Sequence, residues 1–193
     1  MANIHFFCGS FDPPHLGHRE IARISRQSCD KLIIFPTHQS PTKLHSPFSS
    51  DVDRFEMSKF NFSGISEVFI DDFELKSLNK NYTIDTINYL KTKYPDDKLT
   101  LVIGSDQWND FTSWFCWEEI LETVNILCFN REQISDNGNK QMEYPNVQFY
   151  SNFHYNISSN KIRSMFQTKD LNVKKILFPQ VLSYIQEKGL YQV

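Results

Sequence analysis

The sequence lacks the features that would place the protein in a membrane or on nucleic acid. It contains no apolar run of the ~20 residues that a transmembrane helix needs, and its N-terminus has no charged segment followed by an apolar one. Its formal net charge is −3, so no overall positive field attracts nucleic acid. We therefore expect no membrane span, no signal peptide and no nucleic-acid partner.

Cysteine is scarce, and the four residues are scattered. Cys8, Cys29, Cys116 and Cys128 form no C-x-x-C pair, and Cys8 and Cys128 lie inside apolar runs. Isolated cysteines in such runs are typical of buried thiols in a reducing compartment, not of disulfides or zinc sites. The pattern therefore predicts a cytoplasmic protein without a metal site of its own.

The chain does contain enough apolar material for a core. Its 193 residues are 40% hydrophobic, and 17 of them are phenylalanine. This length and composition are typical of a globular protein. Because no repeat, low-complexity tract or clear linker divides the chain, we expect a single domain over residues 1–193. Its oligomeric state stays unknown, since no pattern reports it.

Short apolar runs alternate with helix-like patterns along the chain. Continuous apolar runs are typical of parallel strands covered on both faces, and their order indicates an α/β fold with right-handed crossovers. The polar residues 130–145 are expected to form a surface loop, and the chain is helical again from Ser158, with Pro179 opening the last helix. The predicted strands are 4–8, 32–35, 68–70, 99–103, 125–129 and 147–150, and the predicted helices between them are 15–26, 51–60, 83–93 and 117–122.

The most informative stretch is HFFCGSFDPPHLGH, residues 5–18. An apolar run ends at Gly9, a turn with two prolines follows, and His15 and His18 stand at the start of a helix-like pattern. Glycine lets the backbone approach a ligand closely, and a helix start offers unpaired N–H groups to an anion. Gly17 is expected to leave room for a nucleotide. A tight turn with two surface histidines is the alternative, but the strand–turn–helix context favours a phosphate site.

Two further segments carry groups suited to a nucleotide. Asp106 follows an apolar run that ends at Gly104, where a carboxylate can accept hydrogen bonds from ribose hydroxyls. Ser158 and Ser159 begin a helix, and Arg163, one turn later, can hold a phosphate with its planar fork of donors. Taken alone, the second pattern is mostly a helix cap.

Other candidates have structural readings of similar weight. Lys43 is a loop lysine that suits either solvent or a phosphate. Thr83, with Asp85 or Thr86, is typical of a capped helix start. For Arg54 we favour a structural ion pair.

Together these motifs resemble the nucleotidylyltransferase superfamily marked by His-x-Gly-His, and most of all its nicotinate or nicotinamide mononucleotide adenylyltransferase branch. Residues 9–18 are similar to G-[GS]-[TS]-F-[DN]-P-x-H-x-G-H, with one residue fewer before Phe11. Residues 157–163 are similar to I-S-S-T-x-I-R, with Asn160 in place of threonine. Residues 36–43, after the second predicted strand, keep only part of the motif P-x-x-x-P-P-H-K that the family often shows there. The resemblance spans nearly the whole chain.

The resemblance implies a Rossmann-like, doubly wound, mainly parallel sheet with helices on both faces and a small C-terminal helical segment. It also implies a role for each motif residue. The implied catalytic residues are His15, His18 and Arg163. The implied ATP contacts are Gly9, Ser10, Phe11, Gly104, Asp106, Ser158 and Ser159. The implied mononucleotide contacts are Lys43, Thr83, Trp114 and Phe115.

The resemblance further implies adenylyl transfer from ATP to nicotinate mononucleotide in NAD biosynthesis, with Mg²⁺ carried on the ATP phosphates. A phosphate monoester is already an anionic nucleophile, so the site needs cations and donors and no general base. Two alternatives stay open: nicotinamide mononucleotide as the preferred substrate, and a non-catalytic nucleotide-binding regulatory module. A cytidylyltransferase or pantetheine-phosphate adenylyltransferase is a further rival, which the Trp114 segment disfavours.

Overall fold

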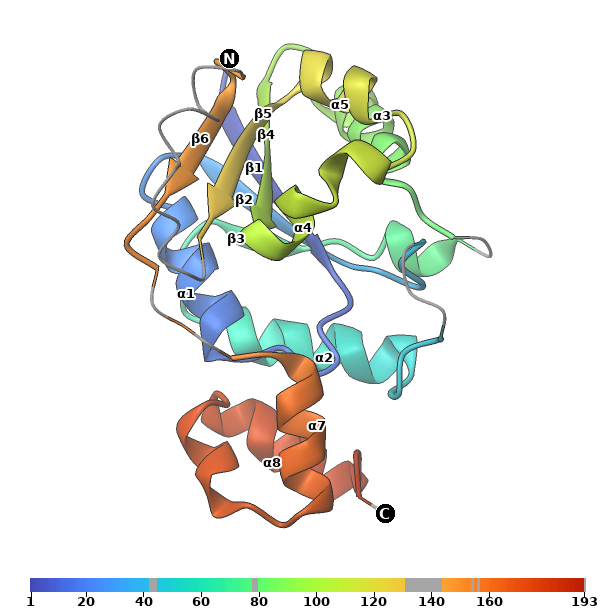
Figure 1. The fold of residues 1–193 in the computed structure, drawn as a ribbon, viewed down its shortest axis with the longest axis vertical. Coiled ribbons are helices and arrows are strands. Elements are labelled where there is room, and N and C mark those ends of the chain that lie inside the picture. Colours follow the sequence, from blue (N-terminus) through green and yellow to red (C-terminus); the bar gives the residue numbers. More distant parts are fainter. Residues whose placement is uncertain (42–44, 78–79, 131–143, 154, 156, 193) are drawn as a thin grey trace.

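Within the residues that the computed structural model describes, six parallel strands form one sheet in the order β3-β2-β1-β4-β5-β6 (Figure 1). The described residues are 1–41, 45–77, 80–130, 144–153, 155 and 157–192. Lys43 and most of the predicted loop at 130–145 lie outside them. The strands are β1 (Asn3–Gly9), β2 (Lys31–Pro36), β3 (Val68–Ile70), β4 (Lys98–Gly104), β5 (Asn125–Phe129) and β6 (Val147–Tyr150).

The strand order reverses at the centre of the sheet. β2 and β3 lie on one side of β1, whereas β4, β5 and β6 lie on the other. This is the doubly wound, Rossmann-like arrangement, so that prediction is confirmed. In such sheets, ligands bind beyond the carboxyl ends of the strands where the order reverses, which here is between β1 and β4.

The helices alternate with the strands as the sequence predicts. The α-helices are α1 (Leu16–Ser25), α2 (Asp51–Phe62), α3 (Thr83–Lys93), α4 (Ser105–Asn109), α5 (Trp117–Thr123), α7 (Ser159–Gln167) and α8 (Pro179–Lys188). In the described part of the chain there are also three 3-10 turns, η1 (Glu74–Lys76), η2 (Phe111–Ser113) and η3 (Leu171–Lys175). No described helix has both the length and the apolar character needed to cross a membrane.

Side-chain alternation along the strands builds a core on each face of the sheet. In β1, Phe6 packs in the core that α3 and α5 cover, whereas its neighbour Phe7 packs in the core that α1 covers. Both faces of the sheet are therefore apolar, which explains why the strands read as continuous apolar runs. The predicted placement of helices on both faces is confirmed.

The C-terminal helices form a third core with α2. Met57 of α2 packs with Ile162 of α7 and Val181 and Ile185 of α8. Figure 1 shows α7 and α8 grouped on the far side of α2 from the sheet. As predicted, Pro179 stands in the first turn of α8, where its missing N–H costs no helical hydrogen bond.

Two local differences from the predicted elements have clear causes. α2 continues to Phe62, two residues beyond its predicted end, because the Phe62 ring is buried in the core beside α1. The short helix α4 was not expected after β4. The Gln107 side chain stabilises its start by accepting the Gly104 N–H at 3.2 Å.

Buried His5 makes the stability of this fold depend on pH. Its Nδ1 lies 2.7 Å from the Ser25 hydroxyl, and burial, with a smaller effect from Arg26, lowers its pKa from 6.5 to about 4. Below pH 6.5 the unfolded chain therefore binds a proton that the folded protein excludes. We expect the free energy of unfolding to fall by up to about 3 kcal/mol between pH 6.5 and 4, as measured by urea denaturation.

A His5→Gln variant is the control, because its amide keeps a polar side chain but does not titrate. The decrease in stability over this pH range is expected to be smaller in the variant than in the wild type. Equal decreases in the two proteins would show that His5 does not cause the effect.

Candidate active site

A cleft of about 1090 Å³ opens where the order of the sheet reverses. Its wall comes from the end of β1 and the loop to α1, the segment after β2, the start of α3, the residues after β4 and the start of α7. Most of the predicted site residues meet there, although they come from distant parts of the chain. Those in the wall are Gly9, Ser10, Phe11, His15, His18, Thr83, Asp106, Trp114, Phe115, Ser158, Ser159 and Arg163.

The two histidines form a reciprocal cap at the start of α1. The His18 N–H donates to Nδ1 of His15 at 3.4 Å, and the His15 N–H donates to Nδ1 of His18 at 3.3 Å. The rings stack with centroids 3.7 Å apart. Since each Nδ1 accepts a backbone N–H, each neutral imidazole carries its proton on Nε2. The cap therefore holds two Nε2–H donors side by side in the wall of the cleft.

Gly17 makes room for this imidazole pair. A Cβ atom at Gly17 would lie 3.0 Å from Nδ1 and 3.1 Å from Cε1 of His15. The missing side chain therefore makes room first of all for the His15 ring, and the room for a nucleotide stays a prediction. The space holds the His15 ring, which explains why a residue with no side chain stands between the two histidines.

Phe11 explains Gly9 in a similar way. Phe11 adopts a left-handed backbone conformation with φ of 46°, which is strained for a bulky residue. Its buried ring lies edge-on to His18, with centroids 5.0 Å apart, and a Cβ at Gly9 would meet that ring at 3.0 Å. The missing side chain of Gly9 therefore accommodates the aromatic ring that supports His18, and the expected approach of its backbone to a ligand stays a prediction.

Helix α7 brings Arg163 to the loop between β1 and α1. The Ser158 hydroxyl caps the helix by accepting the Lys161 N–H, and the Ser159 hydroxyl donates to the Pro13 carbonyl at 2.9 Å. Arg163 donates to the Asp12 carbonyl, and its Nη1 lies 3.8 Å from the Asp12 carboxylate. The guanidinium is therefore oriented at the cleft wall by the loop that carries the histidines.

Asn160 also orients this guanidinium. Arg163 Nη2 donates to Asn160 Oδ1, and the ring of Phe48 lies 4.3 Å from the guanidinium carbon. The residue that departs from the resembled family motif therefore contacts the arginine within the same helix. The side chain of Arg163 is 14% exposed.

The other end of the cleft is aromatic. Phe115 is 59% exposed, and its ring lies 4.9 Å from that of Tyr82, centroid to centroid. Trp114 packs against Phe111 of η2 at 5.4 Å. Thr83 is the first residue of α3 but does not cap it. The cap residue is Tyr82, whose N–H donates to the Asp85 carboxylate at 3.3 Å. The expected capped helix start with Asp85 is therefore confirmed, with Tyr82 in place of Thr83 at its first position.

Two predicted site residues, Gly104 and Lys43, are not among those just named. Gly104 is buried at the end of β4 and is not in the cleft wall. The exposed Asp106, two residues later, is in the wall. Lys43 lies outside the described residues, so its predicted contact with a phosphate stays a prediction.

Glu74 is a wall residue for which the sequence gives no signal, because it stands in a three-residue turn without a motif. The Thr86 hydroxyl donates to its carboxyl at 2.7 Å, and burial raises the pKa of Glu74. Burial, together with the charge of Glu74, also raises the pKa of Cys8 far above its ordinary value. Cys8 is therefore a protonated thiol at neutral pH and cannot act as a nucleophile.

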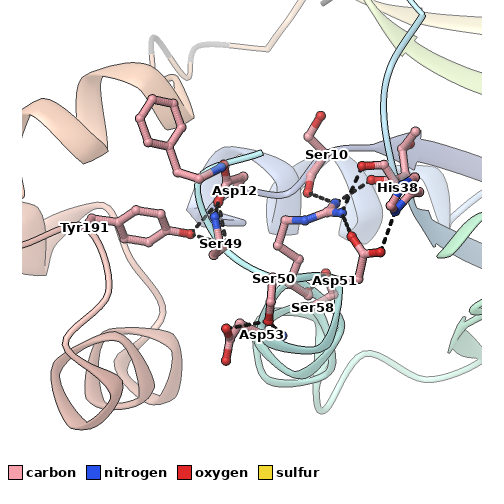
Figure 2. A network of polar contacts seen from close by, with 12 residues as sticks. Ser10, Asp12, His38, Ser49, Ser50, Asp51, Asp53, Ser58 and Tyr191 are labelled. Carbon is pink, nitrogen blue, oxygen red and sulfur yellow. Dashed lines mark hydrogen bonds and ion pairs between the residues drawn. The ribbon is translucent and has the colours of Figure 1, made fainter. Parts of the chain in front are cut away.

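Arg54 joins the segments that follow β1 and β2. Its side chain is fully buried, donates to the carbonyls of Ser10 and Thr37, and pairs with Asp51. It also donates to the His38 carbonyl at 3.2 Å. Figure 2 shows Ser10, His38 and Asp51 gathered around this group. The predicted structural ion pair is confirmed, and the additional carbonyl contacts fix the positions of two loops.

Comparison with protein families gives a match over most of the chain. Residues 6–165 match a family model described as cytidylyltransferase-like. A probable nicotinate-nucleotide adenylyltransferase of Shouchella clausii is 34% identical and covers 99% of this chain and 97% of its own length. Another, of Leptospira interrogans, is 35% identical over 96% of this chain and 94% of its own length.

Comparison with solved structures supports the fold. A nicotinic acid mononucleotide adenylyltransferase of Plasmodium falciparum, solved in complex with NaAD, superposes with a TM-score of 0.85 and 22% sequence identity. The match covers 99% of this chain and 98% of that one. The whole sheet and the C-terminal helices therefore share one architecture with this protein.

The buried Arg54 predicts a stability effect that a surface arginine does not share. In Arg54→Lys the charge remains, but a lysine lacks the planar fork that reaches several oxygens, so buried carbonyls lose their donors. We expect a loss of about 2 kcal/mol or more in the free energy of unfolding.

Arg23→Lys is the matched control, because Arg23 pairs with Glu20 on the surface and its side chain is 57% exposed. Its effect on the free energy of unfolding is expected to be much smaller than that of Arg54→Lys, because solvent screens an exposed ion pair. Urea denaturation of both variants makes the comparison, and similar losses in the two would contradict the structural role of Arg54.

Proposed function

Because this chain belongs to the cytidylyltransferase-like family, and to the nicotinate-nucleotide adenylyltransferases within it, we propose that the cleft is where ATP meets nicotinate mononucleotide. The enzyme transfers AMP from ATP to nicotinate mononucleotide and releases pyrophosphate. One observation supports placing the reaction in this cleft. The two imidazoles of the α1 cap and the guanidinium of Arg163 line the same cavity, although the sequence separates them by more than a hundred residues.

The chemistry follows from the charges. A phosphate oxygen of the mononucleotide attacks the α-phosphorus of ATP, a new P–O bond forms there, and the bond to the leaving pyrophosphate breaks. The attacking phosphate is already an anion, so no side chain has to remove a proton. The protein has to bring two anions together and stabilise the charge that develops on the transferred phosphoryl group and on pyrophosphate.

His15, His18 and Arg163 are suited to that task. The Nε2–H groups of the stacked imidazoles provide two donors for phosphate oxygens, and the guanidinium provides a planar fork of donors. The helix starts at α1 and α7 add positive dipole ends, which favour anions. We assign to the ATP side, in addition, the backbone of Gly9, Ser10 and Phe11, the Ser158 and Ser159 region and the Asp106 carboxylate. The Phe11 ring is buried, so its contribution is made by the backbone.

The aromatic end of the cleft suits the pyridine ring of the mononucleotide. Trp114 and Phe115 offer ring faces for an electron-poor aromatic ring, and Thr83 offers the start of helix α3 to the carboxylate of nicotinate. Lys43 is assigned to the mononucleotide phosphate on the sequence motif alone. Gly104 is assigned to the backbone turn that places Asp106.

Mg²⁺ enters as part of the ATP substrate in this proposal. Among the described residues, no three His, Cys, Asp or Glu side chains gather closely enough to hold a metal ion. Phosphate oxygens are hard ligands that Mg²⁺ prefers, and the bound ion neutralises part of the triphosphate charge.

A pyrophosphate-release assay with ATP and either nicotinate or nicotinamide mononucleotide tests the function. We expect a higher kcat/KM with nicotinate mononucleotide. ATP binding without pyrophosphate release from either pair would instead indicate a regulatory nucleotide-binding module, and a preference for the amide would refute the assigned substrate.

His18→Ala tests the assignment of the imidazole cap. The variant loses one Nε2–H donor and the ring that stacks on His15, so kcat is expected to fall by ~10² or more, the scale for one donor to a developing oxyanion. His38→Ala is the control, because that imidazole pairs with Asp51 and is not in the cleft wall. We expect its kcat to stay near the wild-type value. Near-normal turnover by His18→Ala would overturn the assignment.

A further inference from the structure

The carboxylate of Asp12 joins three separate segments beside the cleft (Figure 2). Asp12 lies in the loop between β1 and α1 and is 3% exposed. It accepts the N–H groups of Phe48 and Ser49 at 2.7 and 3.2 Å and the Ser49 hydroxyl at 2.5 Å. Its fourth donor is the Tyr191 hydroxyl, at 2.7 Å, from a residue 179 positions further along the chain.

Tyr191 is held in a constrained position to make this contact. α8 ends at Lys188, and the residue that caps it, Gly189, is in the left-handed region with φ of 62°. Tyr191 itself also has φ of 62°. A tyrosine in that conformation is strained and persists only where its surroundings hold it. The ring lies 6.0 Å from that of Phe166 in α7, and the hydroxyl reaches the loop that carries the histidines.

Counting protons defines what Tyr191 contributes. The hydroxyls of Ser49 and Tyr191 lie 2.9 Å apart, and each has one proton. Either hydroxyl can donate to the other, and both lie within hydrogen-bond distance of the same oxygen of Asp12, Oδ1. Burial and the Asp12 carboxylate raise the pKa of Tyr191 well above its ordinary value, so the hydroxyl stays a donor.

The other oxygen of Asp12 faces Arg163. Nη1 of Arg163 lies 3.8 Å from Oδ2, which is too long for a hydrogen bond, and donates to the Asp12 backbone carbonyl. The N–H of Phe48 donates to Oδ2, while the Phe48 ring lies against the guanidinium. The carboxylate is therefore satisfied mostly by neutral donors, and Arg163 is near it without being bound in a bidentate pair.

We propose that Tyr191 is a positioning residue for ATP binding, acting through Asp12 on Arg163. Its hydroxyl donates to Oδ1 and offsets part of the carboxylate charge, which weakens the attraction of Asp12 for the guanidinium beside Oδ2. Without that donor, Asp12 draws Arg163 into a closer ion pair, and the arginine must break this pair to reach the ATP phosphates. The proposal rests on the assignment of Arg163 to ATP in the proposed function.

The test compares ATP affinity in Tyr191→Phe and Tyr184→Phe. Tyr184, in α8, is a matched control, because its hydroxyl also donates to a carboxylate, that of Asp53, at 2.9 Å. Neither Tyr191 nor Tyr184 is in the cleft wall. By calorimetry with MgATP, we expect Tyr191→Phe to raise the Kd about fivefold, the effect of one net hydrogen bond, and Tyr184→Phe to leave it unchanged. In turnover assays the KM for ATP rises with the Kd, while kcat and the KM for nicotinate mononucleotide stay near the wild-type values.

A double-mutant cycle shows whether the effect passes through Arg163. Arg163→Met weakens ATP binding by itself, and Tyr191→Phe is expected to add nothing in that background. An unchanged Kd in Tyr191→Phe, an equal change in Tyr184→Phe, or the same fivefold effect in the Arg163→Met background would each overturn the proposal. Failure of the wild type to release pyrophosphate would refute the proposed function instead, and the Kd comparison would still decide the role of Tyr191.

Discussion

The loop between β1 and α1 is buried, and each of its carbonyl groups therefore needs a hydrogen-bond donor. Different parts of the chain provide these donors. The Gly9 carbonyl accepts the Thr37 N–H at 2.9 Å, Ser10 accepts from Arg54, Asp12 accepts from Arg163, and Pro13 accepts from Ser159. The residues after β2, helix α2 and helix α7 are consequently fixed relative to the imidazole cap. Three of these donor residues, Thr37, Ser159 and Arg163, also line the cleft.

This requirement explains why the active site is built from both ends of the chain. A parallel sheet brings strand ends together but leaves the segments that follow them to be held by side chains. Arg54 and Arg163 are placed by carbonyl oxygens as much as by carboxylates, so each arginine links loops that the sheet alone would not connect. The third core, between α2, α7 and α8, holds in place the helix α7 that carries Arg163.

The sequence predicted those parts of the structure that depend on local patterns. Apolar runs gave the six strands, and Gly9 and the proline at position 179 marked a strand end and a helix start. Long-range contacts were not predictable in this way. The glycines at 9 and 17 were singled out from the sequence, but the rings of Phe11 and His15 that pack against them were not predictable, because these contacts depend on the folded geometry. Nothing local connects Asp12 with Tyr191, or Glu74 with Thr86, since each contact exists only once the sheet has formed.

The position of Tyr191 bears on how the protein is handled in the laboratory. The N-terminus lies at the opposite end of β1 from the cleft, whereas the C-terminal segment reaches the histidine loop (Figure 1). An affinity tag or fusion partner joined behind residue 193 would therefore begin two residues from a hydroxyl that contacts the site. The same tag placed before Met1 would begin far from it, which makes the N-terminus the better attachment point for purification and immobilisation.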